Sequence, residues 1–406
     1  MTEGVTTSEH QAATDVLIIG AGVVGLTLAQ GFREAGIPFQ IFEKLEASSE
    51  SSQGWGLTLH WSLNPLERTI GPRLTALLPE TDKAGFLFLN AATCEPKYHV
   101  YPTKRFLRAG RQKLRAVLAS GLKIQYGKQL QSFDASSEGR VVARFQDGTS
   151  TTGSLLIGAD GNNSVVRQGL KMENAQLTPL PINLIGAVRH FTPEEAVPVR
   201  DLNPLLFFAL HPESRTFFFY SIQEVLQDAD GRSSYDALVG VSWEVKDPKV
   251  DEIPRTSRER VAVMKQRAKG FAEPLLSMIM GIPDDSTTAT GLRLADFPCV
   301  PWDNSHGLVT LAGDAAHAMT MFRGEGANHG ILDAALLVEQ LKQAYAGKIN
   351  QVTALKVYET EMQERTHAAV LRSRQAAFDG HDWESVNDQS PLIGARVPPA
   401  SALAMM

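Results

Sequence analysis

The chain has 406 residues, of which 43% are hydrophobic and 21% charged, a composition typical of a globular protein and a length suited to two domains. Its formal net charge of −6 argues against nucleic acid or an anionic membrane surface as a partner. The only cysteines, Cys94 and Cys299, imply no disulfide framework and favour a reducing compartment, the cytoplasm. No apolar run approaches the ~18 residues of a membrane span, and no metal site is predicted.

The first predicted unit, from Asp15 to Glu43, is an apolar strand, a glycine-rich turn, a helix and a second strand. The turn reads G-x-G-x-x-G. Gly20 allows a tight turn, Gly22 lets a pyrophosphate touch the backbone, and Gly25 lets the helix pack closely on the strand. Glu43 stands about 20 residues further on, where an acid hydrogen-bonds a ribose hydroxyl. The spacing predicts a dinucleotide at the helix N-terminus.

Two segments follow whose meaning the residues leave open. In G-W-G-L-T-L, residues 54–59, two glycines bracket Trp55, which indicates either a loop close to a flat group or a turn before a strand. Residues 104–122 have the apolar period of a helix. Arg108, Arg111 and Arg115 lie on its polar side, and on this pattern alone they are a solvated face.

A β-hairpin is predicted from Val141 to Ile157, with its turn at Asp147-Gly148. Its second arm runs into G-A-D-G, which places Asp160 at the end of a strand, where it can meet a ligand over the sheet. A later buried strand, residues 308–312, runs into Gly313 and Asp314, and a glycine-rich turn then opens another helix. A last amphipathic helix is predicted over residues 352–378.

The middle of the chain is different in character. Residues 205–210 and 216–222 are aromatic-rich strands, and residues 239–245 alternate between apolar and other side chains as in a half-buried strand. A capping-box spacing starts a helix near Thr256. The pattern predicts a mostly antiparallel sheet inserted into an α/β domain. Its aromatic face either lines an apolar cavity or is ordinary core.

Glu43, Asp160 and Asp314 each follow a predicted strand, and together their motifs resemble the three fingerprints of class A flavoprotein monooxygenases, the para-hydroxybenzoate hydroxylase-like family. F-R-G-E-G-A-N and G-W-G-L-T-L are similar to its fungal secondary-metabolism branch. The resemblance runs from Asp15 to about Arg374. It implies an α/β fold, with a Rossmann-like FAD-binding domain, an inserted antiparallel substrate domain and a C-terminal helix. The implied ranges are 15–75, 104–180 and 290–380 for FAD, 76–103 and 181–289 for substrate, and tails at 1–14 (disordered) and 381–406 (loose).

The resemblance also implies roles for individual residues. The glycines of the first turn would hold the FAD pyrophosphate, Glu43 the adenosine ribose and Asp314 the ribityl chain. The motif of Asp160 is linked to both FAD and NAD(P)H, Arg167 would order that loop, and His317 would organise its own loop. The cofactor-binding residues implied are Gly20, Gly22, Gly25, Glu43, Lys44, Gly56, Arg111, Asp160, Asp314, Gly326, Ala327 and Asn328.

The implied reaction is that of the family. NAD(P)H binds transiently, in agreement with the absence of a second dinucleotide fingerprint, and reduces non-covalently bound FAD. A flavin C4a-hydroperoxide then transfers one oxygen atom to an aromatic or unsaturated hydrophobic molecule in a dry pocket, by hydroxylation or epoxidation. An oxidase or reductase on the same scaffold is the alternative. A halogenase is disfavoured because its W-x-W-x-I-P segment is missing. Met321 replaces the family's usual proline before the flavin, and Leu332 its usual glutamate.

The substrate, the choice of NADPH or NADH and the oligomeric state do not follow from the sequence. Arg189 and Tyr220 are the leading catalytic candidates, with His211 and Tyr235 behind them. Arg189 follows an apolar segment, residues 184–188, where an unpaired charge would be costly. Its alternative role is to pair with a carboxylate or to end a strand.

Overall fold

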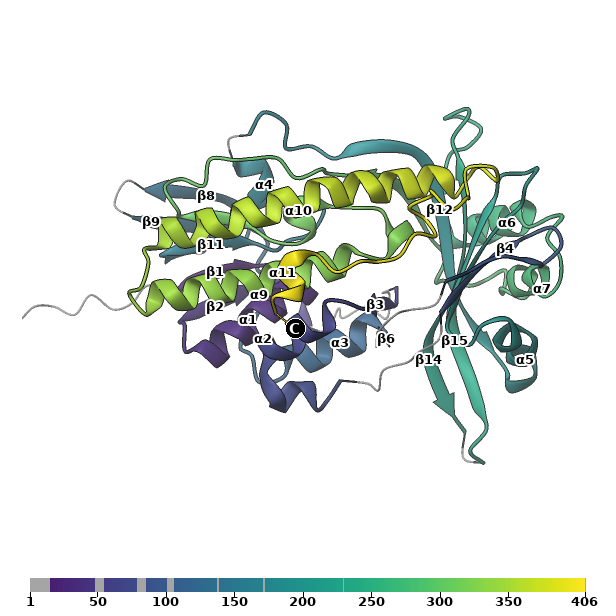
Figure 1. Ribbon diagram of the computed structural model, residues 1–406, viewed down its shortest axis with the longest axis horizontal. Helices are drawn as coiled ribbons and strands as arrows, with labels where there is room; N and C mark the ends of the chain where they lie inside the picture. The colour runs from purple at the N-terminus through teal and green to yellow at the C-terminus, as the bar shows by residue number, and fades with distance from the viewer. Residues whose placement is uncertain are drawn as a thin grey trace, which may run out of the picture.

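The computed structural model describes residues 15–47, 55–78, 85–100, 106–136, 139–170, 172–228 and 230–405. An α/β part is built on a parallel sheet, and a large, mostly antiparallel sheet stands across its end (Figure 1). This arrangement confirms the expected fold class. The proposed domain ranges stay a prediction, and the tail at 1–14 lies outside the described residues. None of the described helices is long and apolar enough to cross a membrane.

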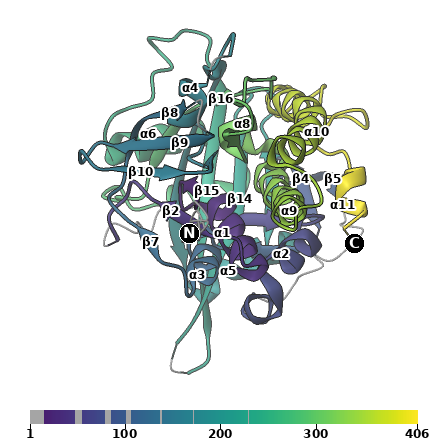
Figure 2. The same cartoon turned by 90° about the vertical axis from the view of Figure 1, so that its left-hand side faces the viewer.

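The α/β part is centred on a five-stranded parallel sheet in the order β17-β11-β1-β2-β7. Its central strands are buried on both faces, as expected of parallel sheets covered on each side. Figure 2 shows helices α1, α9 and α10 on one side of it and the sheet β10-β9-β8 on the other. The bounds are β1 (Val16–Ile19), β2 (Phe39–Phe42), β7 (Ile124–Gln125), β11 (Leu155–Gly158), β17 (Val309–Leu311), α1 (Val23–Ala35), α2 (Leu63–Thr75), α9 (Gly326–Tyr345) and α10 (Gln351–Asp379).

The predicted hairpin is present, but its second arm divides. β9 (Arg140–Phe145) pairs with β10 (Ser150–Gly153) and with β8 (Leu130–Ser136), whereas β11 belongs to the parallel sheet. The helix predicted over residues 104–122 is wrong at its start. Residues Leu107–Ala109 form β6, which pairs with β3 (Leu57–Leu59), and α3 (Arg111–Ala119) begins only after the extended Gly110.

The second sheet has seven strands in the order β16-β12-β15-β14-β13-β4-β5, antiparallel except between β13 and β4. Helices α5, α6 and α7 cover its outer face, and its inner face looks toward the α/β part (Figure 1). The capping box of α6 is confirmed at Thr256. The bounds are β4 (Phe86–Asn90), β5 (Pro96–Val100), β12 (Thr178–Phe191), β13 (Leu206–Leu210), β14 (Phe217–Gln227), β15 (Ser233–Glu244), β16 (Thr290–Asp296), α5 (Pro193–Leu202), α6 (Ser257–Arg267) and α7 (Leu275–Met280).

The segment after α10 is not the loose tail that its composition suggested. Val386 and Leu392 are fully buried, and residues Ala400–Leu403 form the short helix α11. Ser390 hydrogen-bonds to Asp379 at the end of α10. Proline, serine and asparagine indicated an irregular backbone correctly, but a few apolar anchors are enough to hold such a backbone against the core. The segment thereby comes to border the cavity described next.

Candidate functional site

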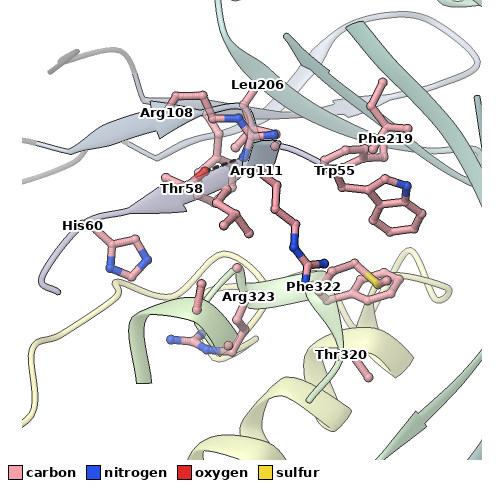
Figure 3. A pocket seen from close by; sticks show the side chains of 18 of the residues that line it. Trp55, Thr58, His60, Arg108, Arg111, Leu206, Phe219, Thr320, Phe322 and Arg323 are labelled. Atoms are coloured by element: carbon pink, nitrogen blue, oxygen red, sulfur yellow. Dashed lines mark hydrogen bonds between the residues drawn. The ribbon is translucent and has the colours of Figure 1, made fainter. Parts of the chain in front are cut away.

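A cavity of about 1880 Å³ lies between the two parts of the molecule. Its walls come from the glycine turn after β1, from the turns after β11 and β17, from the β3–β6 pair and from the inner face of the seven-stranded sheet. The C-terminal segment closes one side with residues 393–398. Figure 3 shows side chains from these separate elements facing one another across the cavity. Ligand-binding clefts of α/β proteins lie at this carboxyl end of the strands.

The glycine turn leaves room for a group against its backbone. Gly20 has a φ of +105°, and a Cβ atom there would lie 2.4 Å from the Ala159 carbonyl oxygen. A Cβ atom on Gly25 would lie 1.9 Å from the Gly20 carbonyl oxygen, so these two glycines serve packing. Gly22 differs, because a Cβ there would meet nothing within 4 Å. As the N-cap of α1 without a side-chain cap, Gly22 leaves the first amides of the helix open to an anion.

Glu43 lies against this turn, at the end of β2. Its Oε2 accepts a hydrogen bond from the Ala21 amide at 2.9 Å, and its Oε1 accepts one from the Leu45 amide at 3.0 Å. The carboxylate is buried and held in place, whereas Lys44 is exposed. Neither lines the cavity. Contacts of Glu43 with the ribose, and of Lys44 with the cofactor, stay predictions.

Asp314 opens the short helix α8 (Asp314–His317) directly after β17. Its carboxylate projects into the cavity, and burial by the surrounding walls raises its pKa although His317 and Arg111 act against this. Gly326, at the start of α9, is open on the same side, since a Cβ there would lie 3.8 Å from Asp314 Oδ1. Gly56, Arg111 and Ala327 also line the cavity. These positions bring together residues more than 200 apart in sequence that were predicted to hold one cofactor.

Asp160 and Asn328 are placed differently from the expectation. Asp160 Oδ2 accepts hydrogen bonds from the Val165 and Val166 amides, so it caps α4 (Val165–Gly169); its neighbours, rather than its carboxylate, line the cavity. The buried Asn328 amide bonds to the carbonyl oxygens of Thr58 and Gly324 and to the His60 amide. It therefore ties β3 to the turn before α9, and its amide is not free for a cofactor, which corrects that part of the expectation.

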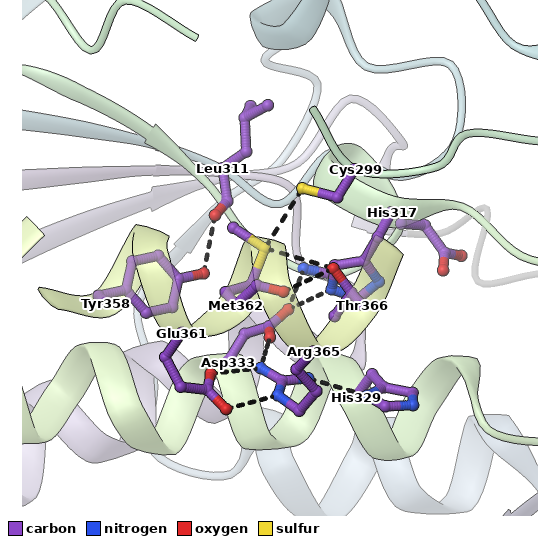
Figure 4. A network of polar contacts seen from close by, with 12 residues as sticks. Cys299, Leu311, His317, His329, Asp333, Tyr358, Glu361, Met362, Arg365 and Thr366 are labelled. Carbon is purple, nitrogen blue, oxygen red and sulfur yellow. Dashed lines mark hydrogen bonds and ion pairs between the residues drawn. The ribbon is translucent and has the colours of Figure 1, made fainter. Parts of the chain in front are cut away.

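A buried polar network holds the turn that presents Asp314 (Figure 4). Asp333 Oδ2 accepts hydrogen bonds from the Gly313 amide at 2.8 Å and from His317 Nε2 at 2.6 Å. Its Oδ1 pairs with Arg365 Nη2 at 2.7 Å. Although burial alone would raise it, the charges and hydrogen bonds of His317 and Arg365 hold the pKa of Asp333 well below its usual range. His317 thus organises the loop, and sequence reasoning gave no role to Asp333 or Arg365.

Arg167 also holds the turn that presents Asp314. Its guanidinium donates to the carbonyl oxygens of Ala315 at 3.0 Å, Asp314 at 3.3 Å and Ala175. The side chain is 1% exposed. It therefore orders the loops around Asp160 and Asp314 through backbone contacts.

The two leading catalytic candidates, Arg189 and Tyr220, lie outside this cavity and cannot act on a molecule bound in it. Arg189 pairs with Glu195 at 2.6 Å and donates to the backbone of α7 at Ser277 and Met278, and Tyr220 is buried in the core under the outer helices. Neither lines the cavity. Side chains alternate between faces along a strand, and the cavity face carries the neighbours of these residues, Val188 and Phe219. His211 and Tyr235 are likewise outside the cavity lining.

The structure adds polar residues that the sequence did not single out. Arg108 lies in the cavity wall rather than on a solvated helix face. His60 faces the cavity with neither ring nitrogen bonded within the described part of the chain. Burial, together with Arg396 and Arg323, lowers the pKa of His60 to about 3, so the ring is neutral. Met321, which stands where the resemblance leads one to expect a proline, lines the cavity, and so does its neighbour Phe322.

A comparison of the whole chain with known proteins agrees with this geometry. Residues 13–373 match the family model described as FAD binding domain. A curated FAD-dependent monooxygenase of Emericella nidulans, dbaB, is 42% identical over 81% of this chain and 87% of its own. A probable FAD-dependent monooxygenase of Arthroderma benhamiae is 36% identical, with 94% and 95% covered.

Solved structures share the fold. The 2,6-dihydroxypyridine-3-hydroxylase of Arthrobacter nicotinovorans superposes with a TM-score of 0.76 at 19% identity, over 96% of this chain and 98% of its own. Klebsiella pneumoniae HpxO, solved with FAD and uric acid, gives 0.75 at 17% identity, with 92% and 91% covered. At these identities the likeness shows the fold alone.

Proposed function

The chain belongs to the FAD binding domain family and is an FAD-dependent monooxygenase, and we propose that it uses NAD(P)H and dioxygen to insert one oxygen atom into an aromatic or unsaturated hydrophobic small molecule. The insertion would be a hydroxylation or an epoxidation in fungal secondary metabolism. One observation carries the proposal. The dinucleotide-binding turn and the aromatic face of the inserted sheet border the same cavity.

The residues at the end of the cavity that is bordered by the glycine turn after β1 fit FAD. The open backbone at Gly22 and the uncapped α1 N-terminus suit a pyrophosphate, and the Asp314 carboxylate has room to accept hydrogen bonds from a polyol chain. Gly326 begins α9, a 20-residue helix whose positive end suits a flavin ring that gains negative charge. When bound, FAD carries electrons from NAD(P)H to dioxygen and activates the oxygen.

The other end of the cavity suits a flat apolar substrate. Phe208, Phe217 and Phe219 stand on the inner face of the sheet, with ring centroids 5.6 Å apart between Phe208 and each of the other two. Trp55 and Leu184 extend this surface. Aromatic walls bind aromatic rings by dispersion and keep water away from the reacting oxygen. The chain's own contribution there is to orient the substrate and to exclude solvent.

The electron donor and the cellular location stay predictions. The first turn is the chain's one dinucleotide fingerprint, which supports a nicotinamide that visits the cavity transiently. Cys94 and Cys299 are both free thiols, as expected of a protein from the cytoplasm.

The direct test is a screen of aromatic and unsaturated compounds with the purified flavoprotein. We expect a subset to accelerate NAD(P)H oxidation, and mass spectrometry should find products heavier by one oxygen atom. NAD(P)H oxidation accompanied only by hydrogen peroxide, or by a dehydrogenated product, would instead establish the oxidase or reductase alternative.

Asp314→Ala should weaken FAD binding by about tenfold or more, because one carboxylate acceptor for the cofactor's hydroxyls is lost. Within the described residues the Asp314 side chain makes no hydrogen bond, so the fold should persist. Fluorescence titration of apoprotein with FAD measures the change, and circular dichroism checks the fold. Asp134→Ala, an exposed carboxylate paired with Arg144, is the matched control. An unchanged FAD affinity would remove Asp314 from the cofactor site.

Gly240→Val should obstruct the substrate end without affecting FAD. Gly240 lies in β15 on the cavity floor, and a Cβ there would already lie 3.4 Å from the Ile185 carbonyl oxygen and 3.9 Å from Phe219. A branched side chain must extend into the cavity. We expect the KM of an accepted substrate to rise about tenfold while flavin content is unchanged. A normal KM would show that substrate does not reach the sheet.

A further inference from the structure

Trp55 stands on the loop before β3 and reaches the inner face of the seven-stranded sheet. Its side chain lines the cavity, and its Cζ2 atom would lie 3.6 Å from a Cβ atom placed on Gly186 of β12. Arg108 holds the backbone next to Trp55, because its guanidinium packs over Gly56, where a Cβ would lie 2.5 Å from Nη2. Arg108 Nη1 also donates to Thr58 Oγ1 at 2.8 Å. The indole is thus presented to the sheet by a loop that is tied down on its other side.

The sheet carries no side chain where Trp55 meets it. Gly186 of β12 and Gly240 of β15 are paired directly across the two strands, and both line the cavity. Phe219 of β14 is paired with Gly240, so the row across three strands reads glycine, glycine, phenylalanine. A glycine inside a strand often marks a place where another group approaches the backbone closely. Gly186 gives this room to Trp55, whereas the nearest neighbours of a Cβ on Gly240 would be atoms of the sheet itself.

The indole of Trp55 has no aromatic partner among the described residues. Phe219, on the far side of Gly240, stacks instead on Phe208, with ring centroids 5.6 Å apart and planes at 26°. Trp55 is only partly buried, and the part of its surface that remains open faces the cavity. Aromatic rings in protein interiors gain free energy by pairing with another ring, beyond what the burial of their area supplies. The partner that Trp55 lacks in the chain is a flat ring.

We propose that Trp55 determines substrate specificity by holding a flat aromatic ring of the substrate over Gly240, between its own indole and Phe219. This rests on the proposed function and narrows its substrate from an aromatic or unsaturated molecule to one with an aromatic ring. Phe219 and Gly186, the residue under the indole, are two strands apart, roughly 10 Å. That span leaves room for one ring in van der Waals contact, at about 3.5–4.0 Å, with both neighbours.

The isoalloxazine ring of FAD is the competing source of a flat partner. The contacts of Trp55 favour the substrate, because its indole lies against β12 of the inserted sheet. The open glycine turn and Asp314, which suit FAD, instead follow strands of the parallel sheet. Figure 3 shows the Trp55 indole on the side of the cavity where Phe219 stands.

The test compares two neutral probes of similar size, 2-naphthol, which is flat, and decahydro-2-naphthol, its saturated and non-planar counterpart. Binding to the FAD-loaded enzyme is measured by calorimetry and does not require turnover. We expect the wild type to bind 2-naphthol more tightly by about threefold to tenfold, the range that a ring pair supplies. Trp55→Leu, which keeps an apolar side chain without a ring, should remove most of this preference. Trp55→Phe should keep it, because a ring remains.

Phe39→Leu, which removes a partly buried ring of β2 outside the cavity lining, is the matched control and should keep the wild-type preference. FAD affinity and melting temperature are measured for each variant. The proposal would be overturned if the wild type did not bind 2-naphthol, if it bound both probes equally, or if its preference survived Trp55→Leu. A loss of FAD affinity in Trp55→Leu without a change in probe preference would also overturn it, and would assign the indole to the isoalloxazine ring. Failure of the proposed function itself is seen separately, as absence of an oxygenated product.

Discussion

Gly22→Val is expected to produce a folded protein that does not retain FAD. At the N-cap of α1 the backbone of Gly22 has φ −73° and ψ −178°, an extended conformation that valine adopts readily. A Cβ atom meets no protein atom within 4 Å, so the fold tolerates it. The same empty space is where we expect the pyrophosphate, and the valine methyl groups would occupy it. Contacts with the helix amides would then be lost.

We expect FAD affinity to fall by more than about 100-fold, because several hydrogen bonds to a charged group are lost together. The measurement is flavin content after purification, followed by titration of apoprotein with FAD. The melting temperature of the apoprotein should equal that of wild-type apoprotein. A yellow Gly22→Val protein with wild-type flavin content would show that the pyrophosphate does not approach this backbone.

Gly25→Val is the informative contrast, three residues away in the same motif. There a Cβ would lie 1.9 Å from the Gly20 carbonyl oxygen, so strand and helix would have to separate. We expect this variant to lower the melting temperature of the apoprotein or to prevent expression of soluble protein. The two glycines thus separate a binding role from a packing role, which their shared motif does not.

Asp333→Asn is expected to be the most destabilising single change in the polar core. Asp333 and His317 are fully buried, and Arg365 is nearly so. Replacing the carboxylate leaves the Arg365 guanidinium with Glu361 as its carboxylate partner and weakens the bond to the Gly313 amide. Breaking a buried charge pair from one side typically costs about 3–5 kcal/mol. Urea denaturation at neutral pH measures the loss.

The loss of stability in Asp333→Asn should become smaller as the pH falls. Because the pKa of Asp333 is held below its usual range, its contribution to stability is complete above the unfolded pKa, about 3.9, and is lost as pH falls through the folded value. The gap between wild type and Asp333→Asn should therefore be largest at neutral pH and narrow on acidification. Asp134→Asn, at an exposed ion pair, should show little gap at any pH. A gap that widens in acid would mean that Asp333 is protonated in the folded chain.

The features of this molecule that could be predicted from sequence are those determined by residues close together in the chain. A G-x-G-x-x-G turn needs its glycines for backbone reasons, and an acid at the end of a buried strand is visible from the strand itself. Gly22 and Asp314 were located in this way, and the structure brings them to one cavity. The family resemblance then joined signals that lie far apart in the chain.

The residues at the substrate end of the cavity could not be predicted in the same way. They depend on which face of a strand each side chain occupies and on contacts between segments far apart in the sequence. Tyr220 and Phe219 are adjacent, and which of them faces the cavity is decided by a register that only the paired strands establish. Arg108 looked like one of three arginines on a helix, but Gly110 ends that pattern and the preceding residues form a strand. Asn328 belongs to a motif of the family, yet its side-chain amide donates a hydrogen bond to the Thr58 carbonyl oxygen and so holds β3.

The most direct test of the proposed oxygen insertion is turnover under isotope-labelled dioxygen with a compound that accelerates NAD(P)H oxidation. If the enzyme inserts oxygen as proposed, the product contains one oxygen atom from the labelled gas and forms with consumption of one NAD(P)H. The Gly22→Val protein, which is expected to keep its fold but lose FAD, should form no such product. A product whose added oxygen comes from water, or a dehydrogenated product with the label found only in hydrogen peroxide, would contradict the proposed oxygen insertion.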